Sequence, residues 1–444
     1  MTNPTAASPN PAAPTLIRAV DRWSLLALVI NGIVGAGIFG LPAKVHALIG
    51  VWGVLAIVAC ALLMAAVVFC FAEVSSRFDA TGGPYLYTAE AFGPFPAFLV
   101  GWLLWLARIA GICAIAGILA EYLALLVPGI DRGAPRAILV TTIIGGFTAL
   151  HVSGVARSVR VGNLITVAKL VPLVALVVYG LTEMNGSAFA PAAWREAEVP
   201  SRANFSSAVL LLTFAFVGWE TALVAAGEPR DPRRDMPFAL LVGLAVVVAL
   251  YVGLQAVCIG LLPELATSTR PLADAATALV GPIGGTIIVI GAAVSMLGTI
   301  NGGMLTISRI PLAMAHAGQL PAVLGKLNAA SRAPVHSIVL SAVVVWLLAL
   351  TSTHVYVLTI STIARLLVFA VTCAALPVLR RKAEVPPARF LLSGGLVLPL
   401  ASLVLIAWLL SGTSGKETRD VLIAAVGGSA LYVVVRAAAK HTPR

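Results

Sequence analysis

The chain has 444 residues, of which 60% are hydrophobic and only 11% are charged, and its mean hydropathy is +1.01. A soluble protein keeps about a quarter of its residues charged, so this composition excludes a soluble globular class. The apolar residues come in runs of about 20, which is the length that crosses a bilayer core. We therefore predict an all-α polytopic membrane protein.

The first 22 residues are polar and rich in Pro and Ala, and they lack the apolar stretch of a cleavable signal peptide. We expect 1–22 to be a disordered cytoplasmic tail and 438–444 a second cytoplasmic tail, on either side of a single transmembrane domain at 23–437. Twelve spans are expected, at roughly 23–49, 51–75, 95–127, 137–156, 160–182, 205–228, 238–262, 283–315, 335–352, 354–379, 390–411 and 418–437.

The distribution of Lys and Arg predicts the orientation. Twelve spans place both termini on one side of the membrane. If that side is the cytoplasm, the cytoplasmic segments hold about twice as many Lys and Arg residues as the opposite side, in agreement with the positive-inside rule. The net charge of +11 is then a consequence of topology and requires no nucleic acid partner. The Ala-rich composition favours a bacterial inner membrane.

Glycines interrupt the first span at 35–40 (GAGIFG). The spacing matches the dinucleotide fingerprint GxGxxG, but that motif needs a preceding strand and an acidic residue about 20 positions later. The glycines could instead let two helices pack closely. In a third interpretation the helix breaks in mid-membrane, and its second half begins near Ile38 with unpaired N–H groups. Such groups are tolerated only where they line a cavity, and a helix N-terminus attracts an anion such as a carboxylate.

The sixth span contains a comparable stretch at 214–220 (FAFVGWE), where Gly218 lies close to Glu220. An acidic side chain in mid-span is costly unless it faces a cavity or a partner. It could simply pair with Arg108 or Arg365 to hold helices together. Interruptions in both the first and the sixth span are typical of an inverted-repeat transporter with a binding site near the bilayer midplane.

Several spaced motifs resemble those of the amino acid–polyamine–organocation (APC) superfamily of transporters. Besides the two interruptions, they are 82–87 (GGPYLY), 90–93 (EAFG), 228–237 (EPRDPRRDMP), 308–309 (SR) and 317–321 (AGQLP), and the resemblance covers about residues 23–380. It implies a 5+5 inverted repeat with broken helices 1 and 6 (repeats at about 23–182 and 205–379), followed by two additional helices at about 390–437.

The same resemblance implies a substrate site between the broken helices. The N–H groups of Ala36, Gly37 and Ile38 would hold the substrate carboxylate, because the broken ends offer N–H groups to anions and C=O groups to cations. The carbonyls of Ile33, Phe214 and Val217 would hold its ammonium beside Gly218, and Phe214 matches the position of an aromatic gate. The remaining lining candidates are mostly small or apolar, which favours a neutral substrate: Ile109, Ile112, Asn301, Gly303 and Ser361.

Lys169 in the fifth span and Glu220 are the candidates for energy coupling. A buried lysine loses solvation, which favours release of its proton, and in proton-coupled relatives a matching lysine takes the place of a sodium ion. Lys169 could instead be a fixed cation that stabilises the broken first helix. Glu220 matches an acidic position that senses pH or braces the site. Arg108 either pairs with Glu220 or selects an acidic substrate side chain.

We predict a secondary active transporter that moves an amino acid by alternating access, coupled to protons. Exchange of amino acids or polyamines, export, and a non-transporting subunit or sensor of the same fold remain open, as does the oligomeric state. A membrane enzyme would need a convergent catalytic set, and none is visible. The histidines lack metal-site spacing, and no GxxxxGK[ST] loop occurs, so no metal or cofactor is expected.

Overall fold

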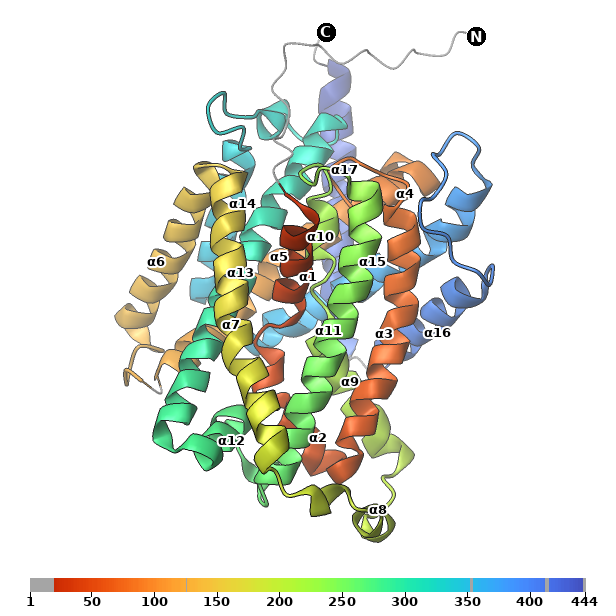
Figure 1. Ribbon diagram of the computed structural model, residues 1–444. Helices are drawn as coiled ribbons and strands as arrows, with labels where there is room; N and C mark the ends of the chain where they lie inside the picture. The colour runs from red at the N-terminus through yellow and green to blue at the C-terminus, as the bar shows by residue number, and fades with distance from the viewer. Residues whose placement is uncertain (1–19, 125, 352–353, 412–414, 442–444) are drawn as a thin grey trace.

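The computed structural model describes residues 20–124, 126–351, 354–411 and 415–441, which form a bundle of helices (Figure 1). In chain order the elements are α1 (Arg22–Ile33), η1 (Gly37–Phe39), α2 (Leu41–Ile49), η2 (Gly50–Trp52), α3 (Gly53–Ser75), α4 (Pro84–Phe92), α5 (Pro94–Ala124), α6 (Gly133–Val152), α7 (Val155–Glu183), η3 (Gly186–Phe189), α8 (Pro191–Glu196), α9 (Arg202–Phe216), α10 (Thr221–Val224), α11 (Pro232–Leu261), η4 (Leu265–Thr267), α12 (Pro271–Val280), α13 (Pro282–His316), η5 (Ala322–Gly325), α14 (Val335–Thr351), α15 (His354–Arg381), α16 (Val397–Ser411) and α17 (Gly415–His441).

The predicted class, a polytopic helical membrane protein, is confirmed. Within the described residues, nine helical stretches are long and apolar enough to cross a membrane, and α1, α12, α14 and α16 are shorter apolar helices. The count of twelve spans and the inverted repeat remain predictions. The nine stretches are Leu41–Ser75, Pro94–Ala124, Gly133–Val152, Val155–Glu183, Arg202–Val224, Pro232–Leu261, Pro282–His316, Ile360–Arg381 and Thr418–Ala437.

Both ends of the described chain include residues of the expected tails that lie in helices or form backbone hydrogen bonds. Val20 donates its N–H to the Glu228 carbonyl (3.1 Å) and accepts from the Arg230 N–H (3.2 Å). Asp21 caps α1 by accepting the Ser24 N–H at 2.7 Å. At the other end α17 continues to His441. The rest of the two expected tails, 1–19 and 442–444, lies outside the described residues.

Both expected helix interruptions are present. α1 ends at Ile33, and the chain then passes through a non-helical stretch and the single turn of η1 before α2 starts. In Figure 1, α1 and α2 follow one another along the bundle with this stretch between them. The second interruption separates α9 from α10, where Gly218 has a φ of +115°. Glycine populates such angles at little cost, so the helix can end there in mid-bundle.

The interrupted helices lie in the interior of the bundle. α1 packs against α7, α11 and α13, and α9 packs against α2 and α3, while α5 packs against α13 and α15. This arrangement brings the non-helical stretches of the two interruptions next to α5, α13 and α15.

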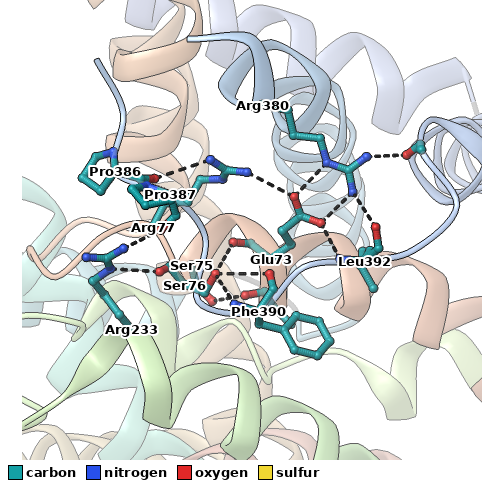
Figure 2. Close-up of polar contacts among 12 residues, drawn as sticks. Glu73, Ser75, Ser76, Arg77, Arg233, Arg380, Pro386, Pro387, Phe390 and Leu392 are labelled. Atoms are coloured by element: carbon teal, nitrogen blue, oxygen red, sulfur yellow. Dashed lines mark hydrogen bonds and ion pairs between the residues drawn. The ribbon is translucent and has the colours of Figure 1, made fainter. Parts of the chain in front are cut away.

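A buried carboxylate, that of Glu73, ties α3 to the segment between α15 and α16 (Figure 2). Its Oε1 accepts hydrogen bonds from Arg380 Nε (2.8 Å) and Arg77 Nη2 (3.2 Å), and its Oε2 accepts from Arg380 Nη2 (2.6 Å) and the Leu392 N–H (2.9 Å). Four donors on one carboxylate satisfy most of its lone pairs, as a buried charge requires.

The segment 382–396, called the connector below, is held along much of its length. Arg233 on α11 donates to the Pro387 carbonyl (2.5 Å) and to the Ser76 carbonyl (3.0 Å), and Ser76 Oγ accepts the Phe390 N–H (3.2 Å) (Figure 2). The sequence prediction started a span at 390, whereas α16 begins at Val397. That boundary is wrong because Gly394 and Gly395 adopt positive φ angles of 111° and 60°, which end the connector just before the helix.

α4 and α12 connect longer helices and were not expected from the sequence. Each has a proline at its start and is followed by a glycine with positive φ, namely Gly93 (89°) and Gly281 (76°). Proline fits the first turn of a helix and such a glycine ends one.

Candidate functional site

A cavity of about 60 Å³ lies where the two interruptions meet. It has room for about four to six water molecules, so it suits a small solute. Its walls come from α1 and the stretch after it, α5, α9, α10, α13 and α15. The lining residues are Gly32, Ile33, Gly35, Ala36, Gly37, Arg108, Gly111, Ile112, Ile115, Phe214, Ala215, Val217, Gly218, Thr221, Thr299, Gly303, Ser361, Thr362 and Arg365.

Most of the residues predicted for substrate binding line this cavity. Ile38 and Ile109 do not, although both are buried, and Asn301 lines a second, smaller cavity beside His151. Lys169 and Glu220 lie behind the wall, fully buried. The predicted residues that do line the cavity are Ile33, Ala36, Gly37, Ile112, Phe214, Val217, Gly218, Gly303 and Ser361.

Free N–H groups mark the first interruption. Val34 and Gly35 still donate to Ile30 and Ile33, and hydrogen bonding resumes with Phe39 and Gly40. Between them, the N–H groups at positions 36–38 donate to none of the described residues. Two of these residues line the cavity, so the interruption presents unpaired donors there.

Free carbonyl groups mark the second interruption. In a continuing α-helix the Gly218 N–H would bond to the Phe214 carbonyl, but it instead donates to Oε2 of Glu220 at 2.8 Å. The carbonyls of Phe214 and Val217 receive no hydrogen bond from the described part of the chain. The Ile33 carbonyl differs, because it accepts from the Gly35 N–H (2.8 Å) and from the Tyr251 hydroxyl (3.1 Å).

Tyr251 joins the two interrupted helices and was not foreseen from the sequence. Its hydroxyl lies 3.1 Å from the carbonyl of Ile33 at the end of α1 and 3.2 Å from the carbonyl of Ala215 near the end of α9. The available signal was a tyrosine in the middle of an apolar span, because a buried phenol needs a hydrogen-bond partner.

Glu220 forms ion pairs with two arginines. Its Oε1 lies 3.3 Å from Nη2 of Arg108 and 3.3 Å from Nη1 of Arg365. Arg108 also hydrogen-bonds the hydroxyl of Thr221. The structure therefore contains the pairing of Arg108 with Glu220 that the sequence left as one of two alternatives. Both arginines are also among the residues that line the cavity, so the pairing does not remove them from it.

Lys169 binds the end of α1 and is not among the residues that line the cavity. Its Nζ donates to the Asn31 side-chain oxygen (2.8 Å), the Asn31 carbonyl (3.0 Å) and the Val34 carbonyl (2.5 Å). Ser295 Oγ donates to the same Val34 carbonyl at 2.9 Å. Three acceptors require three donors, which an ammonium supplies and a neutral amine does not. The geometry therefore fits a charged lysine that closes the broken end of α1.

The part of the chain that the structure describes contains no cluster of three or more His, Cys, Asp or Glu side chains that could bind a metal ion. The polar groups around the cavity are backbone amides and carbonyls, hydroxyls and guanidinium groups. Such groups bind charged organic solutes through hydrogen bonds rather than metal coordination.

Comparisons with known proteins identify the family to which this chain belongs. Residues 20–435 match a protein family described as "Amino acid permease". The serine/threonine exchanger SteT of Bacillus subtilis is 31% identical over 306 residues, which cover 67% of this chain and 68% of that protein. The methylthioribose transporter of the same organism is 25% identical and covers 94% of this chain and 93% of its own length. The cadaverine/lysine antiporter of Escherichia coli is 25% identical over 70% of each chain. The chain belongs to the amino acid permease family of the APC superfamily.

Proposed function

We propose that the cavity between the two interrupted helices binds an amino acid and that the protein carries it across the membrane by alternating access. The observation that supports this most is that two sets of unbonded backbone groups border one cavity. These are the N–H groups at 36–38 and the carbonyls of Phe214 and Val217. An amino acid carries one anionic and one cationic group, and helix ends of opposite polarity complement both.

The hydrogen bonds of these groups support an assignment of the two charged ends of the substrate. The N–H groups of Ala36, Gly37 and Ile38 would bind the carboxylate. The ammonium would bind the carbonyls of Ile33, Phe214 and Val217. The Ile33 carbonyl has the least capacity left, because it already accepts the Gly35 N–H and shares the single Tyr251 hydroxyl proton with the Ala215 carbonyl.

Phe214 fits the role of a mobile gate. A Cβ atom on Gly37 would lie 3.3 Å from the Phe214 ring, so the ring rests against the first interruption at the edge of the cavity. The present cavity holds only a few water-sized groups, so a complete amino acid requires the ring to move outward. Lid and gate movements of this kind are common in binding proteins that exclude water from their sites.

Proton coupling through Lys169 is the proposed energy source. Its ammonium holds the end of α1 in this conformation, and loss of its proton would release one of the three hydrogen bonds that it donates. The broken helix would then be freer to move, which couples protonation to alternating access. Glu220 would remain an ionised brace through its ion pairs with Arg108 and Arg365.

Exchange without protons is the second candidate, favoured by the relatives. Two of them are named an exchanger and an antiporter, which supports exchange as a candidate mode for this chain. The printed names also differ in substrate, from serine and threonine to lysine and methylthioribose. The family alone therefore leaves the side chain of the substrate open.

Reconstitution in liposomes tests these proposals. Purified protein is given a panel of labelled amino acids, with methylthioribose as an additional substrate, in vesicles with and without a pH gradient. Uptake driven by the gradient supports proton coupling, whereas uptake only into preloaded vesicles supports exchange. No flux of any amino acid under either condition would overturn the proposal.

We also propose the finer topology: twelve spans, an inverted repeat of 23–182 and 205–379, and both termini in the cytoplasm. The cluster of Arg77, Arg233 and Arg380 at the end of the bundle where α1 begins supports this orientation. Single cysteines placed in the α1 and α17 ends and labelled with a membrane-impermeant reagent in intact cells would test it. Labelling of either end from outside would contradict the orientation.

A further inference from the structure

Two arginines share one carboxylate at the cavity wall, which leaves a positive charge there. Glu220 is the acidic side chain that the described residues place within ion-pair distance of Arg108 and of Arg365, and both pairs use the same oxygen, Oε1. Its other oxygen accepts the Gly218 N–H. One negative charge therefore faces two positive charges. A net buried charge is costly unless something compensates it.

The donor groups of the two arginines are also incompletely used. Nε and Nη2 of Arg108 and Nε of Arg365 have no hydrogen-bond partner among the described residues, and the oxygen Oε1 of Glu220 receives ion pairs rather than well-aligned hydrogen bonds. The side chain of Arg108 is only 4% exposed, and that of Arg365 is 12% exposed. Buried guanidinium donors without partners are rare, and a planar guanidinium is well suited to bind a carboxylate through two parallel hydrogen bonds.

The neighbouring residues make room for these groups at the cavity. A Cβ atom on Gly111 would lie 2.7 Å from Nη2 of Arg365, so glycine at this position lets the guanidinium lie against α5. Ser361, one turn before Arg365 on α15, donates to the Ala107 carbonyl at 2.6 Å and ties α15 to α5. The arginine pair is thus set in a packed wall beside the cavity.

We propose that the arginine pair Arg108–Arg365 binds a carboxylate on the side chain of the substrate, so that the transported amino acid is an acidic one such as aspartate. This inference rests on the proposed function of the cavity. The N–H groups at 36–38 bind the α-carboxylate, and the second carboxylate compensates the extra positive charge of the arginines. A cationic substrate is disfavoured by the same charge, and a neutral one leaves it uncompensated.

Transport of L-aspartate and L-asparagine in liposomes is the test, because the two substrates have the same size and differ in charge. Hydrogen bonds to charged groups predict that kcat/KM for L-aspartate exceeds that for L-asparagine by about 10- to 100-fold. Arg365→Gln removes this preference by lowering L-aspartate transport by a larger factor than L-asparagine transport. Arg365→Lys keeps the charge but not the planar fork, so it retains part of the preference.

Arg132→Gln is the control for the loss of one positive charge, because the Arg132 side chain is 86% exposed and lies away from the cavity. It should leave the preference for L-aspartate over L-asparagine unchanged.

If asparagine or lysine is carried as well as aspartate by the wild type, the inference is overturned while the proposed function stands. If Arg365→Gln lowers both substrates equally, the arginines bind the α-carboxylate and the inference is again overturned. If no amino acid is carried, both proposals fail. Should Arg365→Gln not fold, the preference of the wild type decides.

Discussion

Gly32 and Gly218 bring the two interrupted helices into backbone contact. A Cβ atom on either glycine would overlap the carbonyl group of the other. Gly218 also has a φ of +115°, which residues with a side chain rarely adopt. Position 218 therefore requires glycine for two separate reasons, and position 32 for one.

Gly218→Ala should abolish transport while the protein still inserts into the membrane. The methyl group would push α1 and α9 apart at the cavity, and the positive φ adds strain of about 1–3 kcal/mol. Transport in liposomes and the amount of folded protein in detergent are the measurements. Gly40→Ala is the matched control, since Gly40 has a φ of −119° and nothing lies within 4 Å of a Cβ atom there. Normal transport by Gly218→Ala would show that the close contact is dispensable.

Lys169→Ala should abolish accumulation driven by a pH gradient. The substitution removes the ammonium that joins α7 to Asn31 and Val34 at the broken end of α1. If Lys169 carries the coupled proton, exchange into preloaded vesicles continues. If it is only a fixed cation, exchange declines together with the melting temperature.

Uptake with and without the gradient, counterflow and thermal melting separate these two outcomes. Thr148→Val on α6 serves as the control, because among the described residues Thr148 Oγ1 bonds only to the Ile144 carbonyl of its own helix, at 2.6 Å. Accumulation that survives Lys169→Ala would exclude Lys169 as the coupling group.

Glu73→Gln should lower the melting temperature and expose the connector 382–396 to protease. The carboxylate is fully buried and accepts four hydrogen bonds, two of them from Arg380. Removing its charge leaves the arginines around it without a counter-ion, and loss of one partner of a buried pair costs about 3–5 kcal/mol.

Thermal melting in detergent and limited proteolysis measure this effect. Asp231→Asn is the control for a lost carboxylate at the same end of the bundle. The Asp231–Arg389 pair is about half exposed (46% and 50%), and an exposed pair contributes about 0–1 kcal/mol. Equal effects of the two substitutions would mean that Glu73 does not anchor the connector.

Asp21→Ala should destabilise the start of α1 by about 0.5–2 kcal/mol, the usual effect of losing an N-cap. The Ser24 N–H, followed by the Ser24 hydroxyl, holds the pKa of Asp21 below its ordinary value. A group with a lowered pKa in the folded state stabilises it above its unfolded pKa and loses this contribution as the pH falls through the folded pKa. The difference in melting temperature between the wild type and Asp21→Ala should therefore shrink in acid.

Melting curves at neutral and acidic pH measure this dependence. Asp21→Asn is the control, because asparagine also caps helices but does not titrate. The difference in melting temperature between Asp21→Asn and Asp21→Ala should stay constant with pH. If the melting temperatures of all three proteins fall in parallel in acid, groups other than Asp21 cause the acid effect.

Much of the fold follows from local features of the sequence. Apolar runs predict helices in lipid because a span must bury its backbone in its own hydrogen bonds. Small residues at 35–37 and the glycine at 218 predict interruptions because they release the chain from helical geometry, and the structure contains both. The boundary at 390 was wrong because the glycines at 394 and 395, rather than hydropathy, decide where α16 begins.

The partners of the polar residues depended on packing between distant segments. The sequence offered Arg108 and Arg365 as alternative partners of Glu220, and in the structure both arginines form ion pairs with its carboxylate. Tyr251 was not foreseen, since only the packing of α11 against α1 brings its hydroxyl to the end of a broken helix.

The sequence by itself determined that this chain lies in a membrane and where two of its helices break, because hydropathy and the conformational freedom of glycine act over a few neighbouring residues. Only the tertiary structure decided that both breaks border one cavity, that two arginines there share one carboxylate, and that Glu73 holds a segment more than 300 residues further along the chain. Contacts of this kind join residues far apart in sequence, and they exist only once the helices have packed.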